Sequence, residues 1–191
     1  MKPEDAEDLT QAFFEKLLAR EFFQKVQKDG GRLRSLLLTS MKHFATDEWR
    51  RGVAQKRGSD RVVEIDGLSA EERLKAEAQD QVGPDLEFDR CWAREILRQA
   101  MEKLEAAYDD SGKAKVFGAL KNQLVSGQDR SYQEIAEELG LAESTARVLA
   151  FKLRRRYRRF IEEAVADTVT TAEQAADELA YLQSLFSSPA S

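Results

Sequence analysis

The sequence predicts an all-α protein in which two small helical domains are joined by an acidic linker. Hydrophobic residues make up 42% and charged residues 34% of the 191 residues, a balance typical of a globular chain. Only ten glycines and three prolines interrupt the chain, and apolar residues recur at the helical period. We therefore expect domains over 1–57 and 86–165, a linker over 58–85, and a C-terminal helix and tail over 166–191.

The first domain is expected to contain two helices. One covers 3–20, where Leu9, Phe13 and Leu17 recur at helical spacing after an acidic first turn. A pair of glycines then ends this pattern, and a second apolar stripe predicts a helix over 32–51. Together they predict one packed helical pair.

The second domain is expected to follow a stretch of weak periodicity. Residues 55–85 contain several glycines and few large apolar residues, with one short helix expected over 70–78. Stronger helical patterns occupy 86–108 and 113–125. An amphipathic helix over 170–186 should dock on the helices before it through one apolar stripe, formed by Ala175, Leu179, Leu182 and Phe186.

Two helices and a tight turn are expected between these elements. Ser131 can cap the first helix, with Glu134 completing a capping box. Ala136 is small enough to let two helices cross closely, and Gly140 tolerates the positive φ that the turn needs. The second helix is expected over 143–163. These features together are typical of a helix-turn-helix.

The outer side of this second helix is polar and basic. Residues in the first turns of a recognition helix reach base edges, whereas later basic residues hold phosphates. Arg147 is the predicted guanine reader, and Val148 could touch a thymine methyl or be a partly packed position. An ordinary helix pair with a solvated basic face is the alternative. The predicted DNA-facing residues are Ser131, Glu143, Ser144, Thr145, Arg147, Val148, Lys152, Arg154, Arg155 and Arg158.

Charge is strongly segregated although the net charge is only −5. Residues 32–61 carry eight positive and three negative groups, and 141–163 carry seven and three. Residues 62–110 carry six positive and fourteen negative groups. Because binding to a polyanion depends on local lysines and arginines, two separate contact surfaces are expected.

Several classes of function are not expected. Cys91 is the single cysteine, which excludes an internal disulfide, and we expect its thiol to be buried. His43 is the single histidine and has no second metal ligand at motif spacing. No glycine-rich phosphate loop, nucleophile–base pairing, signal peptide or membrane-spanning run is present. The prediction is a cytoplasmic protein that is not an enzyme and needs no cofactor or metal.

With both halves considered, the chain resembles the sigma-70 family of bacterial RNA polymerase initiation factors. Residues 4–18 resemble the helix that binds the polymerase clamp, and 131–159 resemble the winged-helix-like region 4 that reads the promoter −35 element. The match is to the compact extracytoplasmic-function type. The acidic tail resembles that of sigma factors from planctomycete-like bacteria.

This resemblance implies roles for residues of the first domain. The residues on or beside the clamp-binding helix face are Asp8, Gln11, Phe14 and Leu18. Core burial is an equal alternative for Phe14 and Leu18. The residues that would contact single-stranded −10 DNA are Lys42, His43, Asp47, Arg50 and Arg51. Phe44 and Trp49 could stack on bases, although their spacing favours the core.

The implied partners are core RNA polymerase, promoter DNA and an anti-sigma factor, with the chain monomeric on the polymerase and no membrane involved. The acidic linker would thread the polymerase's basic channel. Family members usually carry a further helix before the segment matching 4–18, so we expect an N-terminally truncated first domain. Two alternatives remain: a stand-alone helix-turn-helix regulator, and a decoy that binds polymerase or an anti-sigma factor without initiating.

Overall fold

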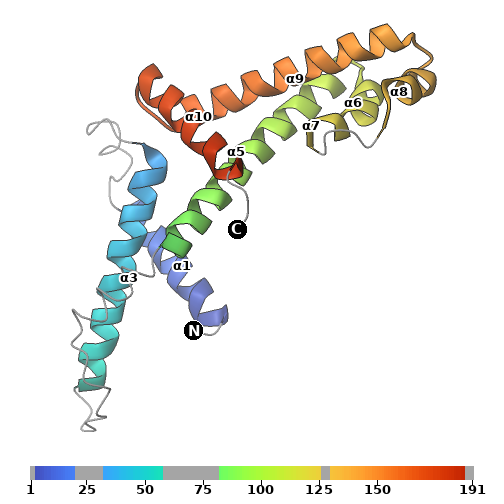
Figure 1. Cartoon of the computed structure of the whole chain (residues 1–191). Helices are drawn as coiled ribbons and strands as arrows, with labels where there is room; N and C mark the ends of the chain where they lie inside the picture. Colours follow the sequence, from blue (N-terminus) through green and yellow to red (C-terminus); the bar gives the residue numbers. More distant parts are fainter. Residues whose placement is uncertain (1–2, 20–31, 58–81, 126–129, 188–191) are drawn as a thin grey trace.

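The computed structural model describes residues 3–19, 32–57, 82–125 and 130–187, and within these ranges all regular structure is helical (Figure 1). The predicted all-α class is therefore confirmed. The helices are α1 (Pro3–Ala19), α3 (Leu33–Arg57), α5 (Val82–Asp109), α6 (Ala114–Leu120), α7 (Asn122–Val125), α8 (Tyr132–Leu139), α9 (Glu143–Ala166) and α10 (Ala172–Ser187). The helix expected over 70–78 and most of the predicted linker lie outside the described residues.

Several helix boundaries differ from the sequence-based expectation, and three of them matter most for the fold. The helix α3 continues to Arg57, and α5 begins at Val82, inside the predicted linker. Pro84 does not prevent this early start, because amides in the first turn have no partner within the helix. The helix expected over 113–125 is divided into α6 and α7 at Lys121.

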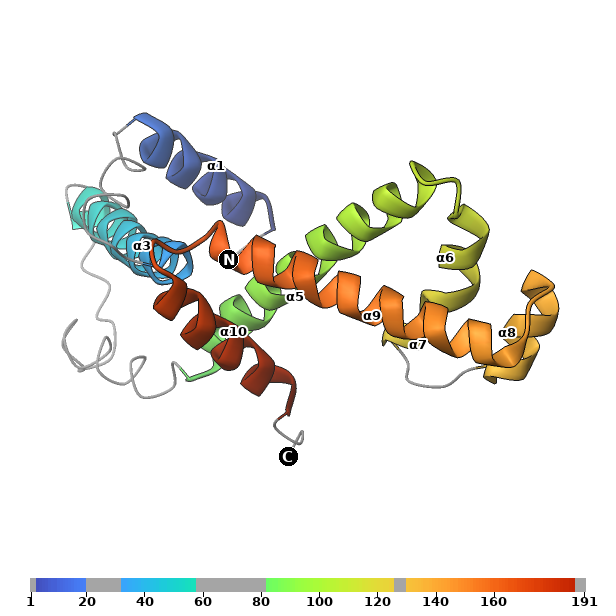
Figure 2. The ribbon, with the colours of Figure 1, turned by 90° about the horizontal axis from the view of Figure 1, so that it is seen from above.

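The long helices α5 and α9 lie side by side and carry most of the core (Figures 1 and 2). At one end of this pair, α6 and α8 complete a cluster whose fully buried members include Leu104, Leu120, Ile135 and Leu153. At the other end α10 packs across both long helices. The predicted docking of the C-terminal helix is thus confirmed.

The docked face of α10 differs in one residue from the predicted stripe. Leu182 and Leu185 are buried with Ile96 and Val165, whereas Phe186, which was expected on this stripe, is 54% exposed. Ala175 and Leu179 pack against the same cluster, so the expected stripe is confirmed except at its last position, where Leu185 takes the place of Phe186.

The helices α1 and α3 form a small apolar cluster of their own. Phe13 and Leu17 of α1 are buried against Phe44 of α3, and the two phenyl rings lie 5.6 Å apart. Leu9 and Leu37 pack around them. This cluster confirms the predicted packing of the first helical pair.

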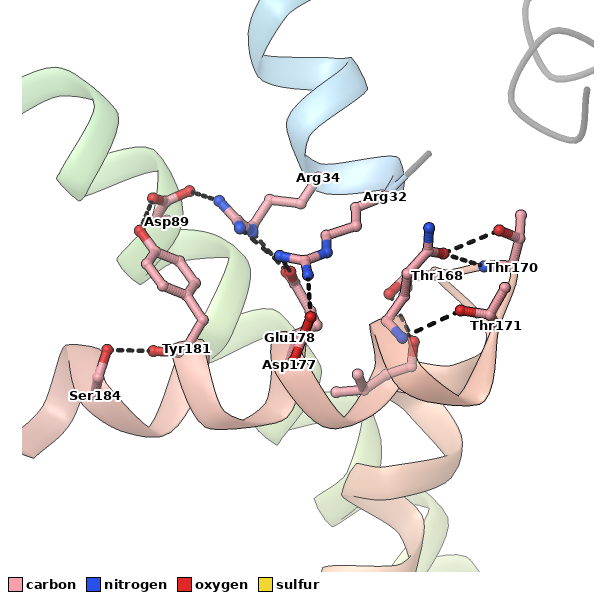
Figure 3. Close-up of polar contacts among 12 residues, drawn as sticks. Arg32, Arg34, Asp89, Thr168, Thr170, Thr171, Asp177, Glu178, Tyr181 and Ser184 are labelled. Atoms are coloured by element: carbon pink, nitrogen blue, oxygen red, sulfur yellow. Dashed lines mark hydrogen bonds and ion pairs between the residues drawn. The ribbon is translucent and has the colours of Figure 1, made fainter. Parts of the chain in front are cut away.

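A polar joint connects α3 to the rest of the molecule (Figure 3). The guanidinium of Arg34 donates to Glu178 of α10 at 2.5 Å and to Asp89 of α5 at 2.6 Å. It also lies over the ring of Tyr181, 4.4 Å from the centroid. Burial disfavours the charged form, but the bonds to Glu178 and Asp89 outweigh it and raise the pKa of Arg34.

Further contacts surround this joint at the first turn of α3. The amide of Leu33 donates to the carbonyl of Thr168 at 2.9 Å, and Arg32 pairs with Asp177 at 2.9 Å. Farther along α3, Lys42 pairs with Asp85 of α5 at 2.5 Å. Cations of α3 thus face anions of α5 and α10, at the opposite end of the long helix pair from α8 (Figure 1).

Candidate nucleic-acid interface

The helix α8 begins with the predicted capping box. The amide of Glu134 donates to the hydroxyl of Ser131 at 3.2 Å, and the amide of Ser131 donates to the Glu134 carboxylate at 2.8 Å. Both groups are amides that a helix start leaves without a backbone partner. The start of α8 is therefore fixed by its own sequence.

The turn after α8 depends on Gly140. Its φ is +66°, in the left-handed region that disfavours residues with a Cβ. A Cβ built at Gly140 would meet nothing within 4 Å, so the requirement for glycine comes from the backbone alone. As predicted, this residue lets the chain reverse from α8 into α9.

Small residues let α8 and α9 cross closely. Ala136 of α8 and Ala146 of α9 are both buried, and Ile135 and Leu153 fill the space beside them. This packing holds α9 by one side and leaves its other side in solvent. The predicted inner and outer sides of α9 are confirmed.

The predicted DNA-facing residues all lie on the surface at the start of α8 and along α9. Those that the structure places in exposed positions are Ser131, Glu143, Ser144, Thr145, Arg147, Val148, Lys152, Arg154, Arg155 and Arg158. Val148 is 51% exposed, so its side chain is accessible on this surface.

A hollow of about 660 Å³ lies between the start of α8 and the first turns of α9. Three arginines line it, Arg130, Arg147 and Arg154, and Glu143 is the acidic side chain among its described lining residues. Arg130 also pairs with Glu138 at 2.5 Å. Tyr132 lies beside them: the Arg147 guanidinium is 5.0 Å from its ring centroid, and Arg154 donates to its hydroxyl. The hollow is therefore suited to an anion.

Three residues of this surface were missed by the sequence analysis. Phe151 is 63% exposed although it lies on α9, and it follows Arg147 by one helical turn, a spacing that could have indicated it. Arg130 precedes the cap, where no helical period marks it. Tyr132 fits the apolar period of α8, which predicts core packing and gives no sign of its contacts with α9.

The four predicted polymerase-binding residues share the exposed side of α1. Asp8 and Gln11 are exposed, and Phe14 and Leu18 are 50% and 70% exposed. The alternative of core burial is thus wrong for both apolar residues. At 100° per residue Asp8, Gln11 and Leu18 lie away from Phe13 and Leu17, which face α3. Phe14 lies at the edge between the two sides, with its ring centroid 5.5 Å from that of Phe13.

The five predicted single-strand contacts lie on α3 but do not form one surface. His43 and Asp47 line a hollow of about 250 Å³ between α1 and α3, and Lys16 approaches Asp47 to 3.7 Å. Arg50 and Arg51 are exposed farther along α3. Lys42 is turned toward α5, where it pairs with Asp85.

Two expectations about burial near these sites are wrong. Trp49 is 47% exposed instead of belonging to the core, whereas Phe44 is buried as expected. The thiol of Cys91 is exposed and lies 3.7 Å from a carboxylate oxygen of Glu87. Both residues follow the apolar pattern of their helices, but the described helices leave their sides uncovered.

Comparison with known proteins adds no family for this chain. No family model, curated protein or solved structure matches it. Among the described residues there is no group of three side chains suited to a metal ion. The described helices also include none with the length and apolar character needed to cross a membrane.

Proposed function

We propose that this chain is a sigma factor that directs bacterial RNA polymerase to promoters. In this proposal α8 and α9 form a helix-turn-helix that reads duplex −35 DNA, and α3 captures the melted −10 strand. The helix α1 binds the polymerase clamp. The acidic segment between the two helical units spans the polymerase.

The exposed side of α9 is the observation that carries this proposal. It presents Arg147, Val148 and Lys152 along the first half of a 24-residue helix whose other side is buried. Arg154, Arg155 and Arg158 continue the same basic surface. A helix of this width fits the major groove of B-DNA, where arginine forms paired bonds with guanine. Lysines and arginines farther along neutralise phosphates.

The exposed apolar side of α1 favours a sigma factor over a regulator that acts alone. Phe14 and Leu18 expose large apolar surfaces on the side of α1 that α3 does not cover. Such surfaces mark contact sites for other proteins when they are adjacent on one face. A regulator that binds an operator by itself has no use for this second surface.

The proposal assigns the chain no bond-making chemistry, cofactor or metal. Its partners are core RNA polymerase, promoter DNA and an anti-sigma factor, and its compartment is the cytoplasm. The chain would be a monomer when bound to the polymerase. The residues that do the work contribute charge, hydrogen bonds and apolar contact only.

The test combines two assays with the full chain. Immobilised chain should retain core RNA polymerase, and the pair should give a start-specific run-off transcript from DNA that the pair itself selects. DNA binding without polymerase retention would instead identify a stand-alone regulator. Retention of polymerase without a transcript would identify a non-initiating decoy. Either result would overturn the proposal.

A further inference from the structure

Tyr132 contacts two arginines of α9 from the first position of α8. Its ring is half-buried against the main core, and Arg147 stacks on it with the guanidinium 5.0 Å from the centroid. Its hydroxyl accepts a hydrogen bond from Nη2 of Arg154, a residue 22 positions away in the chain. The side chain of Tyr132 therefore restrains both Arg147 and Arg154.

The two arginines are placed for different tasks. They are seven positions apart, about two helical turns, so they lie on the same side of α9. Both line the hollow between α8 and α9. Arg147 is in the first turns, where base edges are reached, while Arg154 lies farther along, where phosphates are contacted.

Among the described residues, the hydrogen bonds of Arg147 use only one edge of its guanidinium. Nε and Nη2 both donate to the same carboxylate oxygen of Glu143, at 3.0 and 2.6 Å. This pairing uses the Nε edge, so the fork formed by Nη1 and the second hydrogen of Nη2 is left for another acceptor. That fork matches the O6 and N7 acceptors of guanine.

We propose that Tyr132 is a positioning residue of the DNA interface and that the hollow beside it takes a backbone phosphate. Stacking on the ring holds Arg147 for base reading, and the hydroxyl holds Arg154 for the phosphate. This inference rests on the proposed function. Its physical basis is entropy: an arginine that is already ordered loses less rotamer freedom when it binds.

Two substitutions separate the two contacts. Tyr132→Phe keeps the ring and removes the hydroxyl, whereas Tyr132→Leu removes both and retains an apolar side chain for the core. Tyr157→Phe is the matched control, because its hydroxyl donates to the Leu97 carbonyl, away from the hollow. Thermal melting shows whether each variant is folded before binding is compared.

Binding of the full-length variants is measured by fluorescence anisotropy on duplex DNA selected by the wild-type chain. The DNA duplexes include every single-base change of the selected sequence, and binding to them is measured at several salt concentrations. Tyr132→Phe should weaken binding about two- to fivefold on all sequences alike, as expected for loss of an ordered phosphate contact. Tyr132→Leu should weaken it further by a similar factor and relax the preference at one base, as loss of the stacking contact implies.

The Arg147→Ala and Arg154→Ala variants distinguish the possible failures. If neither changes DNA binding, the proposed function of α9 is itself wrong. If both weaken binding while folded Tyr132→Phe and Tyr132→Leu bind and discriminate like wild type, the positioning role alone is overturned. Equal loss in Tyr132→Phe and in the Tyr157→Phe control would also overturn it.

Discussion

Arg34 and Glu178 lie 144 residues apart in the chain and form a buried ion pair at 2.5 Å (Figure 3). Glu178 is only 1% exposed, and Asp89 approaches the same guanidinium from α5. Moving charged groups out of water costs free energy, so a buried ion pair of this kind adds little net stability. It instead favours one arrangement of the helices that carry it. No apolar cluster of the described residues spans this joint. The orientation of α3 therefore depends on this polar joint.

Arg34→Met should release α3 from α5 and α10. The substitution removes the cation from Asp89 and leaves Glu178 with only Arg32, at 3.7 Å, a loss of about 3–5 kcal/mol for a buried pair of this kind. Hydrogen exchange measured by mass spectrometry should become faster at the start of α3 and in α10. Arg98→Met is the control, because Arg98 pairs with Glu95 on the exposed side of α5. Equal hydrogen-exchange protection of α3 and α10 in Arg34→Met and Arg98→Met would contradict the role of this joint.

Gly140→Ala should destabilise the chain by about 1–2 kcal/mol, because an alanine must adopt the left-handed backbone at φ +66°. Urea unfolding measures the difference in the free energy of unfolding between the variant and the wild-type chain. Gly118→Ala is the matched control: Gly118 is inside α6 and also has nothing within 4 Å of a built Cβ. Alanine favours the helix there and should raise stability by about 0.5–1 kcal/mol. The same sign for both variants would refute the explanation.

The double substitution Phe14→Ser and Leu18→Ser should abolish retention of core RNA polymerase without loss of stability. Both side chains are exposed, so their removal costs the folded chain little. Phe13→Ser is the contrasting variant, because Phe13 is buried against Phe44 and its loss should unfold the α1–α3 pair. Retention of polymerase by the folded double variant would exclude this side of α1 as the contact.

Arg155→Ala should weaken binding to all DNA sequences alike. A residue that contacts only phosphate releases a counterion on binding, so its loss should reduce the slope of log K against log salt by about one. The slope is obtained from anisotropy at several salt concentrations. Arg94→Ala, on the exposed side of α5, serves as the control for loss of one charge. A sequence-dependent effect of Arg155→Ala would instead assign it to base reading.

The local structure of α8 and α9 was predictable because each determinant is close in sequence. Ser131, Glu134 and Gly140 act within one helix end, and the apolar period shows which side of α9 is buried. The exposure of Trp49 and Cys91 was not predictable, because an apolar pattern does not show whether a neighbouring helix covers it. The pairing of Arg34 with Glu178 has no periodic signal at all, since it joins distant segments.

Only the part of the candidate site that depends on local sequence was predictable. The cations of α9 follow from helical spacing, but their contacts with Tyr132 depend on how α8 crosses α9. Lys42 was expected on a DNA-facing surface, and its pairing with Asp85 depends on where α5 begins. Tertiary placement therefore decided which predicted cations lie together.

Selection of duplex DNA by the wild-type chain and by Arg147→Ala tests the central claim most directly. If α9 reads bases through Arg147, the variant should lose about 1–3 kcal/mol of discrimination at one base pair and keep the rest of the preferred sequence. Sequencing of the selected pools measures this at every position. An identical preference in both pools would remove Arg147 from the reading surface. Absence of any preferred sequence in the wild-type pool would contradict sequence reading by α9.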